Sequence, residues 1–238
     1  MDIRGYGQSS KPSDIACYAK SAMSHDCIVV MDSLFPSSTP FYVLAHDRGA
    51  RVAHKLAVDH PHRVRAAIFL DICPTLGMYE ATNLDFAKGY WHWFFLIQPS
   101  PLPETLISAN PRRFAELCMG AFQPRGLDIF VPEAFDAYVA SLADEDTLHA
   151  MCQDYRAAAT LDLDEAREDL AHGRLIQSPL LVLWGAQGVV AKQFDAVKEW
   201  RSVTKEGVTV EGRPVESGHY MPEEIPDEIV ETARQFFK

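Results

Sequence analysis

The feature that most constrains the fold is a short apolar run, Phe41–Ala45, that leads almost directly into Asp47 and then into a helical pattern. The run FYVLA is rich in β-forming residues and suits a strand that is buried on both faces of a parallel sheet. Apolar residues at helical spacing follow Gly49, and the pattern ends near Pro61. A second buried strand after this helix completes a βαβ unit, whose crossover is nearly always right-handed. The chain is therefore predicted to be an α/β protein.

The rest of the chain divides into further core elements and a different, helical stretch. Outside the 41–61 segment we predict a helix over 18–34, strands over 66–70, 179–185 and 208–210 with Val215 after a turn, and an amphipathic closing helix over 225–237. Between them the chain is helical, aromatic and punctuated by prolines. We therefore expect a first core part at 1–73, a helical cap at 74–174 and a second core part at 175–238.

Composition excludes several classes of function. The formal net charge of −11 argues against a nucleic-acid partner. No stretch approaches the ~18 consecutive apolar residues of a membrane span. The five cysteines are scattered and odd in number, which predicts reduced thiols and no zinc site, and we expect no other metal. The N-terminus does not have the pattern of a signal peptide, so we expect a cytoplasmic protein.

The turn around Asp47 has the pattern of a nucleophile elbow. Ala45 and Gly49 are the two small residues that flank the nucleophile position in this strand-to-helix turn. Backbone N–H groups at a helix N-terminus favour a negative charge, so Asp47 is expected to stay ionised. A carboxylate nucleophile attacks a saturated carbon and forms an ester on itself. The alternative is that Asp47 only caps the helix.

An ester on Asp47 must be hydrolysed, which requires a general base and an acid that orients it. In chain order such hydrolases run nucleophile, acid, histidine, and His219 follows the final predicted strand. The loop after Gly185 carries no acid, so Asp71, at the end of the preceding strand, is predicted to orient His219. The alternatives are a solvent-facing histidine and an aspartate that caps a turn.

Several segments together resemble the haloacetate (fluoroacetate) dehalogenases of the α/β-hydrolase superfamily. The matching segments are Asp2–Ser9, His46–Arg51, Leu70–Ile72, Tyr90–Phe95 and Gly218-His219. The resemblance implies an α/β-hydrolase fold with a mostly parallel central sheet and an inserted helical cap, a homodimer, and chemistry without any cofactor. Members of this family have two or three strands before the Asp2–Ser9 loop, so we expect a chain that is truncated at its N-terminus and lacks these strands.

The resemblance also implies how the substrate is held. Arg48 and Arg51 lie three residues apart in the first helical turn, so both are expected to face one pocket and hold a carboxylate. The resemblance assigns His92, Trp93 and Tyr155 to a halide pocket whose N–H and O–H groups solvate the departing ion. Solvated arginines and an aromatic cap core are the plainer alternatives.

The predicted function is hydrolytic dehalogenation of a haloacetate to glycolate and halide. A rival is an epoxide hydrolase, which polarises the epoxide oxygen with cap tyrosines; Tyr90, Tyr138 and Tyr155 are available. An uncharged epoxide gains nothing from two arginines, which favours the haloacid. A second rival is a non-catalytic protein of the same fold that binds a small carboxylate.

Overall fold

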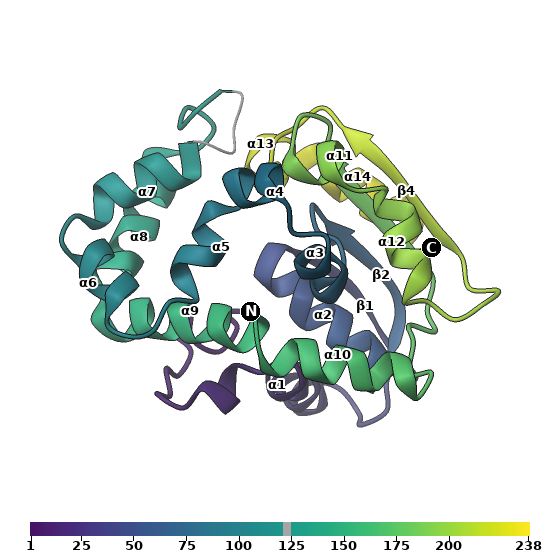
Figure 1. Cartoon of the computed structure of the whole chain (residues 1–238). Coiled ribbons are helices and arrows are strands. Elements are labelled where there is room, and N and C mark those ends of the chain that lie inside the picture. The colour runs from purple at the N-terminus through teal and green to yellow at the C-terminus, as the bar shows by residue number, and fades with distance from the viewer. Residues whose placement is uncertain (121–124) are drawn as a thin grey trace.

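The computed structural model describes residues 1–120 and 125–238 and has a parallel four-stranded sheet at its centre (Figure 1). The strands stand in the order β1 (Phe41–His46), β2 (Val64–Leu70), β3 (Leu180–Gly185) and β4 (Val210–Val215). Every neighbouring pair among them is parallel. The predicted α/β class with a parallel sheet is confirmed, and the carboxyl ends of the four strands meet at one edge.

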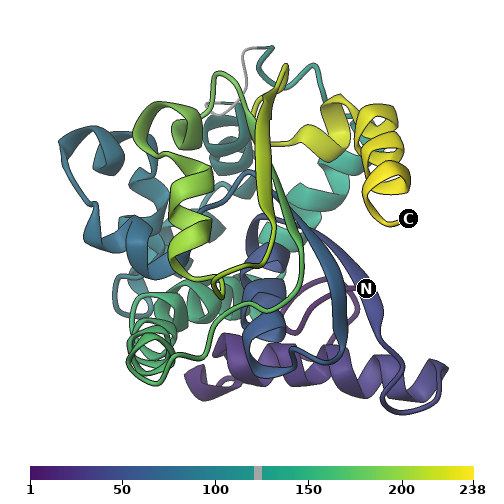
Figure 2. The same ribbon diagram turned by 90° about the vertical axis from the view of Figure 1, so that its right-hand side faces the viewer.

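Helices cover both faces of this sheet (Figure 2). Successive residues of a strand point to opposite faces and therefore contact different helices. Ile68 and Leu70 pack toward the closing helix α14 (Pro226–Phe236) through a cluster that includes Ile229. Phe69 points to the opposite face, where it meets Trp200 of α12 (Ala196–Ser202). Complete burial of such side chains contributes roughly 1.5–3 kcal/mol each.

The last strand differs from its prediction. We expected a turn between Val210 and Val215, but β4 is continuous across this stretch. It pairs with β3 alone among the described strands and is therefore an edge strand, where a proline such as Pro214 is tolerated. Gly212 permits close packing, because a Cβ there would lie 2.8 Å from the Trp184 ring and 2.9 Å from a β3 carbonyl.

Helices fill the chain between β2 and β3. Within 74–174 the described residues contain no strand, and Figure 1 shows α5 to α9 gathered at one side of the sheet layers. The helices of this stretch are α3 (Thr75–Glu80), α4 (Leu84–Gly89), α5 (Trp91–Leu96), α6 (Leu102–Ser108), α7 (Pro111–Gly120), α8 (Pro132–Ala143), α9 (Glu145–Ala158) and α10 (Leu161–Ala171). Among all described helices, none combines the length and the apolar character needed to cross a membrane.

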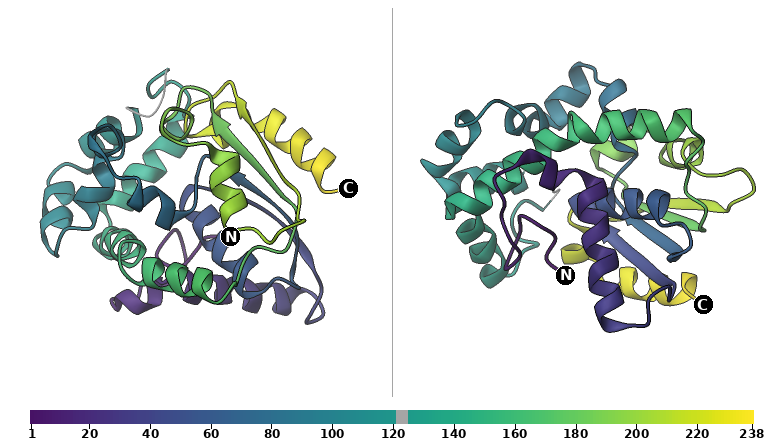
Figure 3. Two further views of the ribbon diagram at one scale, coloured as in Figure 1. Left: turned by 45° about the vertical axis from the view of Figure 1, so that its right-hand side comes forward. Right: turned by 90° about the horizontal axis from the view of Figure 1, so that it is seen from below.

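The remaining helices flank the core. They are η1 (Ile15–Tyr18), α1 (Lys20–Leu34), α2 (Asp47–Asp59), α11 (Val189–Gln193) and α13 (Met221–Glu224). The N-terminal loop before η1 runs beside the cap helix α9, as the view from below in Figure 3 shows. The Gln153 amide of α9 donates a 2.8 Å hydrogen bond to the Ser13 carbonyl, so this loop joins core and cap.

Candidate active site

The elbow begins at the carboxyl end of β1. His46 is the last residue of the strand and Asp47 is the first residue of α2, so no loop separates strand from helix. Asp47 has φ 44°, a left-handed conformation that is uncommon for any residue except glycine. Such strain is characteristic of functional sites, where the surrounding structure holds the residue in place.

The structure brings together the three residues that the sequence predicted as a catalytic set. His219 Nδ1 lies 2.6 Å from Asp71 Oδ2, and His219 Nε2 lies 3.9 Å from Asp47 Oδ2. The other oxygen of Asp71 accepts a 3.0 Å hydrogen bond from the Gly185 N–H. Asp71 therefore fixes the ring of His219, whose far nitrogen is directed at Asp47.

The charges of this set support one another. Burial opposes a charge on Asp47, but the positive charge of His219, 3.9 Å away, outweighs burial and lowers the pKa of Asp47 far below its usual range. Burial likewise opposes a charge on His219, while Asp47 and Asp71 raise the pKa of His219 to about 10. Both shifts favour a negative charge on Asp47 and a positive charge on His219 before substrate reacts.

A cavity of 860 Å³ opens in front of Asp47, between the elbow and the cap. Its wall contains Arg48 from the elbow, His92 from α5, Tyr155 from α9 and His219 from the loop after β4. Burial lowers the pKa of His92 to about 3 and raises the pKa of Tyr155 well above its usual value, so both are neutral. A neutral imidazole and a phenol can each donate a hydrogen bond to an anion in this cavity.

Arg48 reaches the cavity from a buried ion pair. Its Nε donates to Asp154 Oδ2 at 2.6 Å and its Nη2 donates to the Asp154 carbonyl at 3.0 Å. The guanidinium also stacks on Tyr155, with 4.2 Å between Cζ and the ring centroid. No hydrogen bond of Nη1 to the residues 1–120 and 125–238 is found, and Arg48 lines the cavity.

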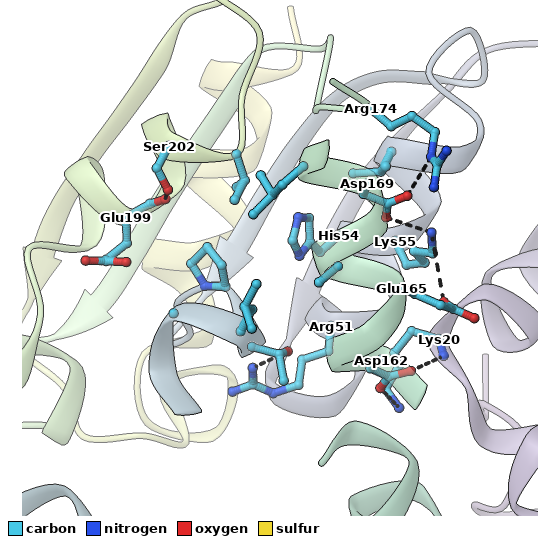
Figure 4. Close-up of a pocket in the computed structure, with 18 of the residues that line it drawn as sticks. Lys20, Arg51, His54, Lys55, Asp162, Glu165, Asp169, Arg174, Glu199 and Ser202 are labelled. Carbon is cyan, nitrogen blue, oxygen red and sulfur yellow. Dashed lines mark hydrogen bonds and ion pairs between the residues drawn. The ribbon is translucent and has the colours of Figure 1, made fainter. Parts of the chain in front are cut away.

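Arg51 does not join Arg48 on the wall of this cavity, in contrast to the prediction. Its Nη1 donates to Thr75 Oγ1 at 2.9 Å and to the Cys73 carbonyl at 3.3 Å. These contacts draw the side chain toward the start of α3, where it lines a second cavity of 240 Å³ (Figure 4). Spacing along α2 places both arginines on one face of the helix, but these hydrogen bonds hold the Arg51 side chain at the start of α3.

Trp93 also lies off the cavity wall. The side chain is 2% exposed and packs among Tyr79, Phe86 and Tyr90, with Arg51 4.6 Å from its ring centroid. Adjacent positions on a helix point about 100° apart, and here His92 is directed to the cavity while Trp93 is directed into this aromatic cluster. The plainer alternative, an aromatic residue of the cap core, describes its place.

Two residues of the site escaped the sequence reasoning. His46 lines the cavity and contacts the loop of His219, and its only signal was its position next to Asp47. Asp154 holds Arg48 from a distance of 106 residues along the chain, and nothing in the sequence connects them. Within the described residues no group of three or more His, Cys, Asp or Glu side chains could hold a metal ion.

This chain is similar to known proteins over nearly its whole length. A family profile described as alpha/beta hydrolase fold matches residues 1–225. The fluoroacetate dehalogenase of Burkholderia sp is 37% identical over 99% of this chain and 76% of that protein. The soluble epoxide hydrolase of Corynebacterium sp. (strain C12) is 28% identical over 99% of this chain and 79% of that protein.

A solved structure has the same three-dimensional arrangement of strands and helices as this chain. A Nostoc sp PCC 7120 protein described as an alpha/beta hydrolase superposes with a TM-score of 0.93 at 42% sequence identity. The match covers 100% of this chain and 80% of that one. The strands and helices that carry the site therefore occur together in a protein of known structure.

Proposed function

The chain belongs to the α/β-hydrolase superfamily and, within it, to the haloacetate dehalogenase family, and from this premise we propose that it hydrolyses the carbon–halogen bond of small haloacetates. The observation that carries the proposal is Asp47 at the elbow, with His219 Nε2 3.9 Å from its carboxylate and the cation of Arg48 on the same cavity wall. A carboxylate in this position forms an alkyl ester, and a cation beside it selects a substrate that bears an anion.

The first step forms the ester. The substrate carboxylate pairs with Nη1 of Arg48, and the buried charge of Arg51, which also interacts with Asp47, adds to the attraction. An oxygen of Asp47 attacks the carbon that bears the halogen, the new C–O bond forms, and halide leaves with the electron pair of the broken bond. His92 and Tyr155 donate hydrogen bonds to the departing halide.

The second step regenerates Asp47. Water loses a proton to Nε2 of His219 and its oxygen attacks the carbonyl carbon of the ester; the bond between that carbon and the alkyl oxygen breaks, and the leaving oxygen takes the proton from His219, which releases glycolate, and the carboxyl group of Asp47 ionises again. Alkylation removes the negative charge of Asp47, one of the interactions that raise the pKa of His219. The histidine therefore becomes a competent base only once there is an ester to hydrolyse.

Epoxide hydrolysis is the second candidate, and one observation favours it. Tyr90, Tyr138 and Tyr155 all line the cavity in front of Asp47, where a phenol could protonate an opening epoxide. Tyr138, however, donates its hydroxyl to the Glu223 carboxylate. The buried cation of Arg48 beside the nucleophile also favours an anionic substrate over a neutral one.

The deciding experiment compares substrates and traps the intermediate. The protein is incubated with fluoroacetate, chloroacetate and styrene oxide, and halide and diol are measured. His219→Ala is incubated with chloroacetate and the Asp47 peptide is examined by mass spectrometry, with Asp47→Asn as the control. We expect halide release and an alkylated Asp47. Diol from styrene oxide without halide release would instead establish the epoxide hydrolase, and an unmodified Asp47 with bound chloroacetate would establish a binding protein.

A further inference from the structure

His46 contacts the loop that carries the base. Its Nε2 lies 2.7 Å from the backbone carbonyl oxygen of His219, and the two imidazole rings are 4.8 Å apart. A carbonyl oxygen can only accept, so Nε2 of His46 must carry the proton and donate it. Burial together with the nearby His219 lowers the pKa of His46 to about 4, and the ring is therefore neutral with its lone pair on Nδ1.

The loop that presents His219 has no regular structure and depends on contacts with its neighbours. The Gly218 N–H donates to the Glu224 carboxylate at 2.9 Å. The loop also packs directly on the end of β3, because a Cβ at Gly185 would lie 2.5 Å from the Gly218 carbonyl oxygen. His46 adds a hydrogen bond to the carbonyl of His219 itself, and it does so from the residue next to Asp47.

We propose that His46 is a positioning residue that fixes His219 relative to Asp47 and thereby controls hydrolysis of the ester but not its formation. This inference rests on the proposed function. His46 is the end of the strand that places Asp47, so its hydrogen bond links the base to the nucleophile through a rigid element. The hydrogen bond of His46 helps to set the distance of 3.9 Å between His219 Nε2 and Asp47 Oδ2. The attacking water must fit next to both of these atoms.

The two steps depend on this link differently. Ester formation needs Asp47, which its own backbone holds at the start of α2. Hydrolysis needs a water held by His219 at the correct distance from the ester carbonyl. A misplacement of about 1 Å in such an arrangement can cost on the order of 100-fold in rate. Loss of the His46 hydrogen bond should therefore slow the second step.

Two substitutions separate the hydrogen bond from the ring. His46→Phe keeps a planar ring and removes the donor, whereas His46→Gln removes the ring and keeps an N–H donor at about the reach of Nε2. With chloroacetate, we expect His46→Phe to release the first equivalent of halide at a rate within about 3-fold of the unchanged protein, and to hydrolyse the ester roughly 10- to 100-fold more slowly. The ester on Asp47 then accumulates in intact-mass spectra, and His46→Gln restores most of the hydrolysis rate.

His54→Phe is the matched control. His54 lies on α2, and burial lowers its pKa to about 4, as it does for His46, but it lines the second cavity and packs against Trp200. We expect both half-reactions to be unchanged in this variant. Equal slowing of both steps in His46→Phe, or no recovery in His46→Gln, would overturn the positioning role.

A measurement without substrate separates this inference from the proposed function. The proton between His219 Nδ1 and Asp71 Oδ2, which are 2.6 Å apart, should give a strongly downfield NMR signal. We expect this signal to shift or broaden in His46→Phe and to return in His46→Gln. An unchanged signal in His46→Phe would refute the role of His46 even if haloacetates are hydrolysed, whereas a shifted signal in a protein that releases no halide would refute only the proposed reaction.

Discussion

Replacement of Asp154 by asparagine should destabilise the protein far more than removal of any exposed ion pair. The Asp154 carboxylate is fully buried and accepts three hydrogen bonds, from Arg48 Nε at 2.6 Å, Lys20 Nζ at 2.6 Å and the Tyr6 hydroxyl at 2.8 Å. It therefore joins the N-terminal loop, α1 and the elbow to the cap helix α9 (Figure 1). An amide removes the negative charge and one acceptor, which leaves the buried Arg48 without its carboxylate partner, whereas Lys20 keeps an ion pair with Asp162 at 3.2 Å.

The expected magnitude follows from the cost of an unpaired buried charge. Removing one partner of a buried ion pair typically costs roughly 3–5 kcal/mol, and the two pairs share one carboxylate, so their costs do not simply add. For a chain of this size each kcal/mol lowers the melting temperature by about 2–4 °C, which gives a decrease of roughly 6–20 °C. Urea unfolding at pH 7, followed by circular dichroism, measures the free energy directly.

The control and the pH dependence make the reasoning testable. Asp136→Asn removes the exposed ion pair with Arg112 and should cost less than about 1 kcal/mol. Burial opposes ionisation of Asp154, but Arg48 and Lys20 lower its pKa below the usual range. A carboxyl group with a lowered folded-state pKa contributes stability above its unfolded-state pKa of about 4, and this contribution is lost as the pH falls. The free energies of unfolding of the unchanged protein and of Asp154→Asn should therefore become more similar in acid. Equal losses in Asp154→Asn and Asp136→Asn would refute the argument.

Three further predictions concern the base, its loop and the cap. Because the folded-state pKa of His219 is raised to about 10, its contribution to stability is complete below about pH 6.5 and is lost toward pH 10; thermal unfolding of His219→Gln should show a smaller dependence over this range. Gly185→Ala should reduce steady-state turnover of chloroacetate by roughly 100-fold, because its Cβ would meet the Gly218 carbonyl oxygen, displace the loop of His219 and slow hydrolysis of the ester; full steady-state activity would contradict this packing. Trp93→Ala should lower the free energy of unfolding by roughly 3–5 kcal/mol in urea titrations, whereas Trp93→Phe should keep halide release within about 3-fold, since the ring lies off the cavity wall.

Local patterns determined the scaffold and the order of the catalytic set. Continuous apolar runs predicted the first three strands, and β2 and β3 are buried along most of their length, as strands covered on both faces must be. The expected burial of β1 on both faces was wrong: β1 pairs with β2 alone among the described strands, is only partly buried and exposes Leu44. Asp47 and Asp71 follow directly on strands of a parallel sheet, His219 comes four residues after the end of β4, and the carboxyl ends of such strands meet at one edge. Their approach could therefore be predicted without knowledge of any distance.

The tertiary structure alone decided which side chains share a cavity. Periodicity showed that Arg48 and Arg51 lie on one face of α2, but not that Asp154 would hold the first and α3 the second. The contacts of His46 and Asp154 could not be predicted locally, because their partners are 173 and 106 residues away along the chain. A spacing fixes the direction of a side chain relative to its own helix or strand, whereas its neighbours, charge and exposure depend on what packs against that element.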